Sequence, residues 1–354
     1  MTGLAEQLSI VPSAIYHHFS GKRELLAAVM DDEIATAEQE VEHWVPDGDE
    51  LAESLARLGL GNQRVMSLWL TTRRHLASED RTALWSRMVA VYNSLKSAVA
   101  LERPDLDDDG VDLLTRCVFG ITQSASLQRA GRGSVAAHRS LAEMITMAIN
   151  SRVADYPHVE ISPRVLFTGR SPLRRERILD AAVRLFAVDG YTDVGLDAIG
   201  REAGIAGPTI YKHFQDKPKL LAAIASRGYE ALRIEVSQVL ESAEDPPAIL
   251  RELIVRYASF TFGNTDFHRI FPSEARHLTP EDLRYFAAMG SAGVGEWVHF
   301  VRLVEPELSA EVATARVRAV HEMILHVALD PVIGCNPAAP SVAIGVAGDL
   351  LGLP

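Results

Sequence analysis

His321 and His326 are the residues whose spacing comes closest to that of a catalytic motif. With Glu322 between them they have the composition of a zinc-protease helix, in which two histidines bind the metal from one helix face. That motif needs its histidines four residues apart, and these are five apart. The sequence also contains no glycine-rich phosphate loop, nucleophile elbow or paired cysteine cluster. We therefore expect no enzymatic activity, no metal and no cofactor.

Tyrosine, histidine and lysine side chains recur at one spacing in two distant stretches. Residues 15–29 match residues 210–224 at nine of fifteen positions, at a constant separation of 195 residues. Further matches, such as 60–62 with 262–264, lie 202 residues apart. A repeat of this length has to be identified before a fold is assigned, because each copy is one structural unit. The two sets of matches indicate a duplication of whole halves.

Helical patterns position these side chains. Apolar residues recur at helical spacing over 175–188, and Asp189-Gly190 is a typical helix end. Shorter helices are predicted over 196–203 and 208–214, with a tight turn at 204–207 between them. Such a pair of helices forms a helix-turn-helix unit. No stretch shows the alternation of a strand, so the sequence predicts an all-α protein.

Proline and glycine residues between 151 and 172, with weak periodicity, suit a linker between the two halves. The second half then has a helix-turn-helix domain followed by a helical domain, and the first half repeats this order without the first helix. The predicted domains are residues 1–34 and 35–150, the linker 151–172, and residues 173–224 and 225–354.

The segment 174–224 closely resembles the DNA-binding domain of TetR-family transcriptional regulators. The first copy resembles the same domain from Leu4 onward, and it begins at Met1, after the position of the family's first helix. The second copy has Gly195 where the family usually has a threonine. The residues of the second copy that carry the resemblance are Arg177, Ile178, Leu179, Asp180, Ala181, Ala182, Leu185, Phe186, Gly190, Tyr191, Ile199, Ala203, Gly204, Ile205, Ile210, Tyr211, Lys212, His213, Phe214, Lys217, Leu220 and Leu221.

This resemblance implies that the second helix of each motif enters the major groove of double-stranded operator DNA. Ser13 and Thr209 are the predicted readers of base edges, and two isoleucines, Ile15 and Ile210, should point into the domain core, as should Phe19 and Phe214. The four residues before each isoleucine differ between the copies, so we expect a non-palindromic operator. The residues expected to face outward and contact phosphates are Tyr16, His17, Lys22, Tyr211, Lys212 and Lys217.

TetR-like proteins are similar in pairing through C-terminal helices and in being released from DNA by a small molecule. The segments 108–130 and 310–330 are expected either to pair in this way, within one chain or in a homodimer, or to be ordinary core helices. The effector should be partly apolar. Arg276 either binds an anionic group of the effector or caps a helix. The candidate ligand-binding residues are Trp69, Trp85, Tyr92, Phe271, Arg276 and Trp297.

Composition is consistent with this interpretation. The net charge of -12 excludes a protein that is basic all over, but a local cationic face is enough for DNA binding. Two cysteines, no signal-peptide pattern and no bilayer-spanning apolar run predict a cytoplasmic protein without a membrane partner. The resemblance favours a ligand-released repressor acting as a covalent pseudo-dimer. The alternative is an interaction protein in which one DNA-binding copy has decayed.

Overall fold

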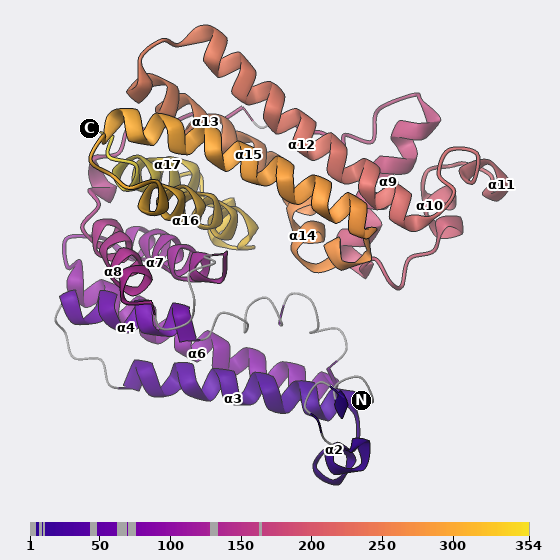
Figure 1. Cartoon of the computed structure of the whole chain (residues 1–354), viewed down its shortest axis with the longest axis horizontal. Coiled ribbons are helices and arrows are strands. Elements are labelled where there is room, and N and C mark those ends of the chain that lie inside the picture. The colour runs from indigo at the N-terminus through magenta and orange to yellow at the C-terminus, as the bar shows by residue number, and fades with distance from the viewer. Residues whose placement is uncertain are drawn as a thin grey trace.

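A computed structural model describes residues 5–6, 9, 11–42, 48–61, 69, 76–127, 134–162 and 165–353 of the chain. Every element of regular structure in these ranges is helical, which confirms the predicted all-α class (Figure 1). Parts of the first copy's predicted motif (Leu4, Leu8) and the repeated Arg74 and His75 lie outside the described residues. Among the helices of the described part, none combines the length and apolar content needed to cross a membrane.

The described residues of the first half form one short α-helix and five long ones. They are α2 (Pro12–His18), α3 (Lys22–Glu42), α4 (Gly48–Gly61), α6 (Ser78–Glu102), α7 (Asp108–Gln123) and α8 (Val135–Ile149).

The second half begins with three helices of the predicted helix-turn-helix domain and continues with a larger helical region. Its helices are α9 (Arg174–Asp189), α10 (Leu196–Glu202), α11 (Gly207–Ile210), α12 (Lys217–Ser242), α13 (Pro246–Gly263), α14 (Thr265–Glu274), α15 (Pro280–Val304), α16 (Ala310–Leu329) and α17 (Ala339–Leu350).

Polar caps fix where several of these helices begin. The Asp107 side chain accepts a hydrogen bond from the Gly110 amide (2.8 Å), and Asp216 does the same for the Lys219 amide (2.8 Å). Such caps satisfy backbone N–H groups that have no partner inside the helix, and each stabilises its helix by about 1 kcal/mol. At the other end of α9, Gly190 has a φ of 81°, a conformation that glycine adopts readily.

The helix bounds of the two halves correspond. Helices α6 and α15 have 25 residues each and begin at positions 78 and 280. Helices α7 and α16 begin at 108 and 310. Both pairs are separated by the same 202 residues that separate the sequence matches.

A single apolar core joins the C-terminal helices of both halves. Helix α7 packs along α16, and Figure 1 shows α7 and α8 stacked against α16 and α17. Gly120 of α7 and Met323 of α16 are both buried at this contact. The buried apolar residues that the sequence placed on the two segments are Leu113, Leu114, Val118, Ile121, Val317, Val320, Ile324 and Ala328.

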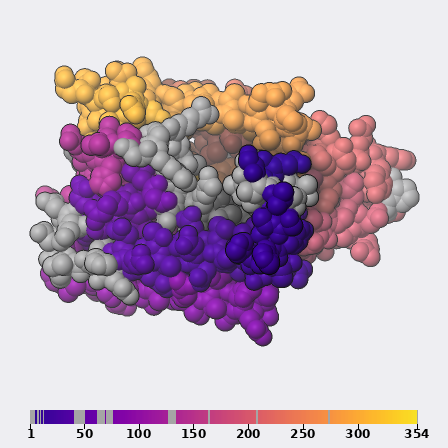
Figure 2. Space-filling model, turned by 60° about the horizontal axis from the view of Figure 1, so that its bottom comes forward, coloured from indigo at the N-terminus to yellow at the C-terminus, as the bar shows by residue number. Residues whose placement is uncertain are grey.

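The predicted linker is held against the second half by specific hydrogen bonds. Tyr156 donates its hydroxyl hydrogen to the Asp349 carboxylate. The Val159 amide donates to Ser341 Oγ at 2.9 Å, and the Leu166 amide donates to Asn264 Oδ1 at 2.8 Å. Figure 2 shows where this organisation leaves the second helix-turn-helix domain: its salmon-coloured residues project to the right of the first-half helices.

Candidate nucleic-acid interface and ligand cavity

Helices α9, α10 and α11 surround a small apolar core that also includes the start of α12. Ile178 of α9, Ile199 of α10 and Ile210 of α11 are fully buried in it. Phe214 is buried beside them, below the Arg175 guanidinium, which lies 5.0 Å from the ring centroid. The predicted inward orientation of Ile210 and Phe214 is therefore confirmed.

The turn between α10 and α11 depends on one left-handed residue. Gly204 has a φ of 63°, and the Ile205 amide donates to the Gly200 carbonyl at 2.8 Å to close the turn. Arg177 of α9 donates to the Ala203 carbonyl and so ties the turn to the first helix. Because side chains with a Cβ rarely adopt this φ, glycine suits the position.

The predicted DNA contacts Tyr211 and Lys212 lie, together with His213, in the turn that follows α11. Tyr211, Lys212 and His213 are exposed, whereas Thr209 is half-buried. Three adjacent donors on one surface are a suitable set for phosphate oxygens. That they contact DNA remains a prediction.

Lys217 differs from expectation. We expected its side chain to face outward, but its ammonium group donates to the carbonyl oxygens of Tyr191 (2.6 Å), Val194 (2.9 Å) and Thr192 (3.3 Å). The same nitrogen lies 4.5 Å from the centroid of the Tyr191 ring, and its desolvation lowers the pKa of Lys217. Lys217 therefore joins the first turn of α12 to the loop after α9, and the expectation of an outward lysine is wrong.

In the first half, α2 presents a comparable surface. Ser13, Tyr16 and His17 are exposed on α2, and Lys22 is exposed at the start of α3. Ile15 is buried, as predicted.

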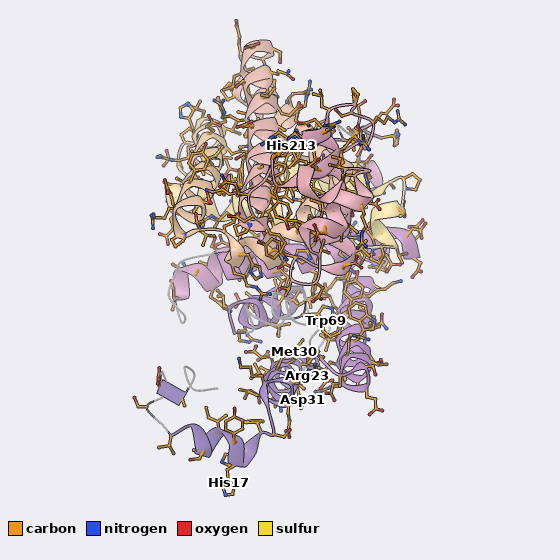
Figure 3. The ribbon with its side chains drawn as sticks, turned by 90° about the vertical axis from the view of Figure 1, so that its right-hand side faces the viewer. His17, Arg23, Met30, Asp31, Trp69 and His213 are labelled. Atoms are coloured by element: carbon orange, nitrogen blue, oxygen red, sulfur yellow. The ribbon has the colours of Figure 1, made fainter. Side chains whose placement is uncertain are left out.

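One residue before α2 and one before α11 share a left-handed backbone conformation. Ser9, which lies 195 residues before Gly204, has a φ of 55°. A left-handed serine is uncommon, since its Cβ makes this conformation unfavourable by about 1 kcal/mol. In Figure 3 the labelled His17 and His213 mark the two surfaces, which lie apart with Met30 and Trp69 between them in the view.

Residues 178–224 match the family model described as "Bacterial regulatory proteins, tetR family". This segment is therefore similar to the TetR family. FasR, a transcriptional activator of Mycolicibacterium smegmatis, is 31% identical over 97 residues, which are 27% of this chain and 44% of FasR. LmrA, a transcriptional regulator of Bacillus subtilis, is 34% identical over 89 residues, 24% of this chain and 47% of LmrA. The chain therefore matches less than half the length of these TetR-like relatives, which are transcriptional regulators.

Solved structures of TetR-family proteins also align with about half of the chain. PfmR from Thermus thermophilus has 23% identity and a TM-score of 0.45, over 49% of this chain and 97% of PfmR. The ketosteroid regulator KstR2 of Mycobacterium tuberculosis has 19% identity and a TM-score of 0.46, over 52% of this chain and 97% of KstR2.

C-terminal to the TetR-family segment, helices α12 to α16 enclose a cavity of about 660 Å³. Of the predicted ligand residues, Phe271 and Trp297 line it. The Trp297 side chain packs edge-on against Tyr257 and His321, with ring centroids 6.1 and 4.8 Å away. The other aromatic residues of the lining are Tyr229, Phe267 and Phe286.

The remaining predicted ligand residues lie elsewhere. Arg276 is exposed beyond the end of α14, and its Nε donates to the neighbouring His277 ring (3.3 Å). Trp69 is buried in the first half and stacks on the half-exposed Trp85, with ring centroids 5.4 Å apart. Tyr92 lies beneath the Arg116 guanidinium, which is 4.4 Å from its ring centroid. None of these four lines the cavity, because their helices and turns face other parts of the molecule.

Three polar residues of the cavity were missed by the sequence analysis. Burial lowers the pKa of His268 and His321 to about 4, so both imidazoles are neutral near pH 7. Burial also raises the pKa of Glu322 to about 7. The Nε2 atoms of both histidines are buried without a hydrogen-bond partner. The signal was present: His321 and Glu322 interrupt the apolar pattern of 317–324, and we considered them only as a metal motif.

Proposed function

We propose that this chain is a sequence-specific transcriptional regulator that binds double-stranded operator DNA through two TetR-like halves in one polypeptide. The observation that carries the proposal is the packing of α7 on α16, two helices that occupy corresponding positions 202 residues apart. Helices related in this way form an isologous interface in symmetric dimers, where the same surface of each subunit meets its copy. Here both copies belong to one chain, so the pair is a covalent pseudo-dimer.

Local geometry supports a working first copy. Ser9 and Gly204 share a left-handed turn, and Ile15 and Ile210 share a buried position at equal separation. An uncommon backbone conformation at a serine is retained only where the surrounding fold requires it. These two shared features support a first copy that folds like the second, although α2 extends over Pro12–His18 and α11 only over Gly207–Ile210.

The two recognition surfaces carry different side chains. Ser13 on α2 has no matching hydroxyl at Pro208, and His17 corresponds to Lys212. Since a helix-turn-helix pair reads one half-site per helix, unlike helices read unlike half-sites. We expect a non-palindromic operator.

Release by an effector follows from the position of α12. This helix begins at Lys217, which is bonded to the DNA-binding domain, and it lines the cavity with Tyr229 and Arg233. At 1.5 Å per residue its 26 residues span roughly 39 Å, so a ligand that displaces the cavity end tilts the domain. The aromatic lining suits a largely apolar effector. A protein that leaves its operator when the effector enters this cavity acts as a ligand-released repressor.

The experiment is selection of bound DNA from a random library, followed by affinity measurements on the selected sequence. We expect one enriched, asymmetric site. Tyr211→Phe with Lys212→Ala, and separately Tyr16→Phe with His17→Ala, should each weaken binding at least tenfold and reduce its salt dependence. Arg81→Ala, an exposed charge removal on α6, is the control and should leave affinity unchanged. Enrichment of perfect inverted repeats alone would contradict the asymmetric operator.

The alternative is a protein whose first DNA-binding copy has decayed and which regulates through a partner. It is favoured by the difference between Lys22, which is exposed, and its counterpart Lys217, which donates to three backbone carbonyls. This alternative holds if the Tyr16 and His17 variants bind the selected site like the wild type while the Tyr211 and Lys212 variants do not.

A further inference from the structure

Where the structure describes first-half positions that correspond to the lining of this cavity, the side chains and their contacts differ. Arg233 of α12 and Met289 of α15 both line it. At separations of 195 and 202 residues they correspond to Glu38 of α3 and Arg87 of α6. The arginine and the methionine that line the cavity in the second half thus correspond to a glutamate and an arginine in the first half.

In the first half these two residues form a bidentate ion pair. Arg87 donates from Nε and Nη2 to the two carboxylate oxygens of Glu38, at 2.8 and 2.6 Å, and also contacts Asp31. The Arg87 side chain is about a third exposed, so the pair is partly shielded from water. Planar bidentate pairs are the strong ones among charge-assisted hydrogen bonds. The pair therefore holds α3 against α6. The corresponding helices of the second half, α12 and α15, border the cavity instead.

Small residues on α15 widen the cavity, and larger residues replace them on α6. Gly290 and Gly293 line the cavity, and a Cβ at Gly293 would meet no atom within 4 Å. Their counterparts are Met88 and Val91. Met88 packs against the buried cluster of Met30, Ile34, Trp69, Leu76 and Leu84. The side chains of α6 thus occupy volume that is open beside α15.

A second contact occupies the inner end of the same region. Arg116 lies 4.4 Å from the centroid of the Tyr92 ring and pairs with Asp330 of the second half. The residues corresponding to Tyr92 and Arg116 are Val294 and Arg318, which both line the cavity. In the first half the Arg116 guanidinium therefore packs on the Tyr92 ring, whereas the corresponding Val294 and Arg318 border the cavity.

From these four differences we infer that the chain binds one apolar, ring-bearing effector molecule, in the second half only, and that the first half is a rigid half without an effector site. The inference rests on the proposed function, because it concerns the regulation of the same cavity. Effector entry then moves one DNA-binding domain of the pair while Arg87 holds the other. One occupied site is enough to break simultaneous contact with two half-sites.

Equilibrium dialysis of the full chain with N-phenyl-1-naphthylamine, a neutral aromatic fluorescent probe, tests this stoichiometry. We expect one molecule bound per chain. Gly290→Met, which introduces the first-half residue, should weaken binding at least tenfold. Gly295→Met is the matched control, because Gly295 lies on the same helix outside the cavity with no atom near its Cβ position, and it should bind like the wild type.

Two equal sites per chain, no binding, or a tight site that survives Gly290→Met would each overturn the inference. Circular dichroism establishes that the variants fold. If Gly290→Met is unfolded, Gly293→Val serves in its place. The dialysis contains no DNA, so failure of the operator selection and failure of the single site are separate results.

Discussion

Gly120 of α7 lies directly against Met323 of α16: a Cβ at Gly120 would come within 2.7 Å of the Met323 Cα. It would also come within 3.3 Å of the carbonyl oxygen of Glu322, the residue 202 positions after Gly120. Gly120 thus meets its own counterpart, as residues on a two-fold axis do. In the proposed pseudo-dimer, the axis that relates the two halves would pass through this contact, and Glu322 also lines the cavity.

Gly120→Ala should lower the free energy of unfolding by about 1–3 kcal/mol, the usual effect of overpacking a core. The clash is with backbone, which cannot rotate away. Gly295→Ala is the control: its Cβ enters open space within α15, so it should be neutral or stabilise by up to about 1 kcal/mol. Urea unfolding measures both. Equal stability of the two variants would mean that α7 and α16 can move apart at Gly120 without a loss of free energy of unfolding.

Arg116→Met should destabilise the chain by about 3 kcal/mol, because it leaves the largely buried Asp330 carboxylate without its cation. Asp330 Oδ1 also accepts hydrogen bonds from the amides of Val332 (2.9 Å) and Ile333 (2.8 Å). Adding Asp330→Asn keeps an oxygen for those amides and removes the unpaired charge. Thermal unfolding should therefore show the double variant to be more stable than Arg116→Met alone, and the opposite order would exclude a direct pair.

Lys217→Met should lower the melting temperature, since it removes three hydrogen bonds to backbone carbonyls. One hydrogen bond to a charged donor contributes roughly 1.5–3 kcal/mol to the free energy of unfolding. Lys22→Met, the same change at the exposed first-half position, should leave the melting temperature within a degree or so. Differential scanning calorimetry compares them, and equal shifts would contradict the assigned role of Lys217.

His268 makes the stability of the chain depend on pH. Its folded pKa is about 4, below the ordinary 6.5, because burial disfavours the imidazolium form. Between these values the unfolded state binds a proton that the folded state does not, so stability falls as pH falls from 6.5 to 4. At about pH 5 the penalty is about 2 kcal/mol relative to neutral pH.

His268→Phe should remove that part of the pH dependence. The wild type and the variant are compared by urea unfolding at about pH 7.5 and about pH 5. The wild type should lose more stability on acidification than the variant. Identical losses would mean that His268 is protonated normally in the fold.

The sequence alone was enough to predict the all-α class, the turn at Gly204 and the burial of Ile210 and Phe214. These features depend on local signals: apolar spacing along a helix, and a glycine where φ is positive. The role of Lys217 was not predictable in this way. Its acceptors at Tyr191, Thr192 and Val194 lie more than twenty residues away in sequence, and only the packing of α12 against α9 brings them together.

The cavity was predicted least well for a similar reason. Phe271 and Trp297 converge on it, whereas Trp85 and Tyr92 do not, although all four are aromatic residues in helical patterns. Which faces of five helices leave a space between them is set by their mutual packing, and the pattern of one helix does not contain that information.

The packing of α7 on α16 within one chain has a consequence for how much protein a cell needs. A regulator assembled from two separate chains loses its DNA-binding pair on dilution, because assembly depends on the square of the subunit concentration. The proposed covalent pseudo-dimer would keep its two halves at a high effective concentration at any dilution. Occupancy of the operator should then rise in simple proportion to the number of chains at low expression, with no threshold for assembly.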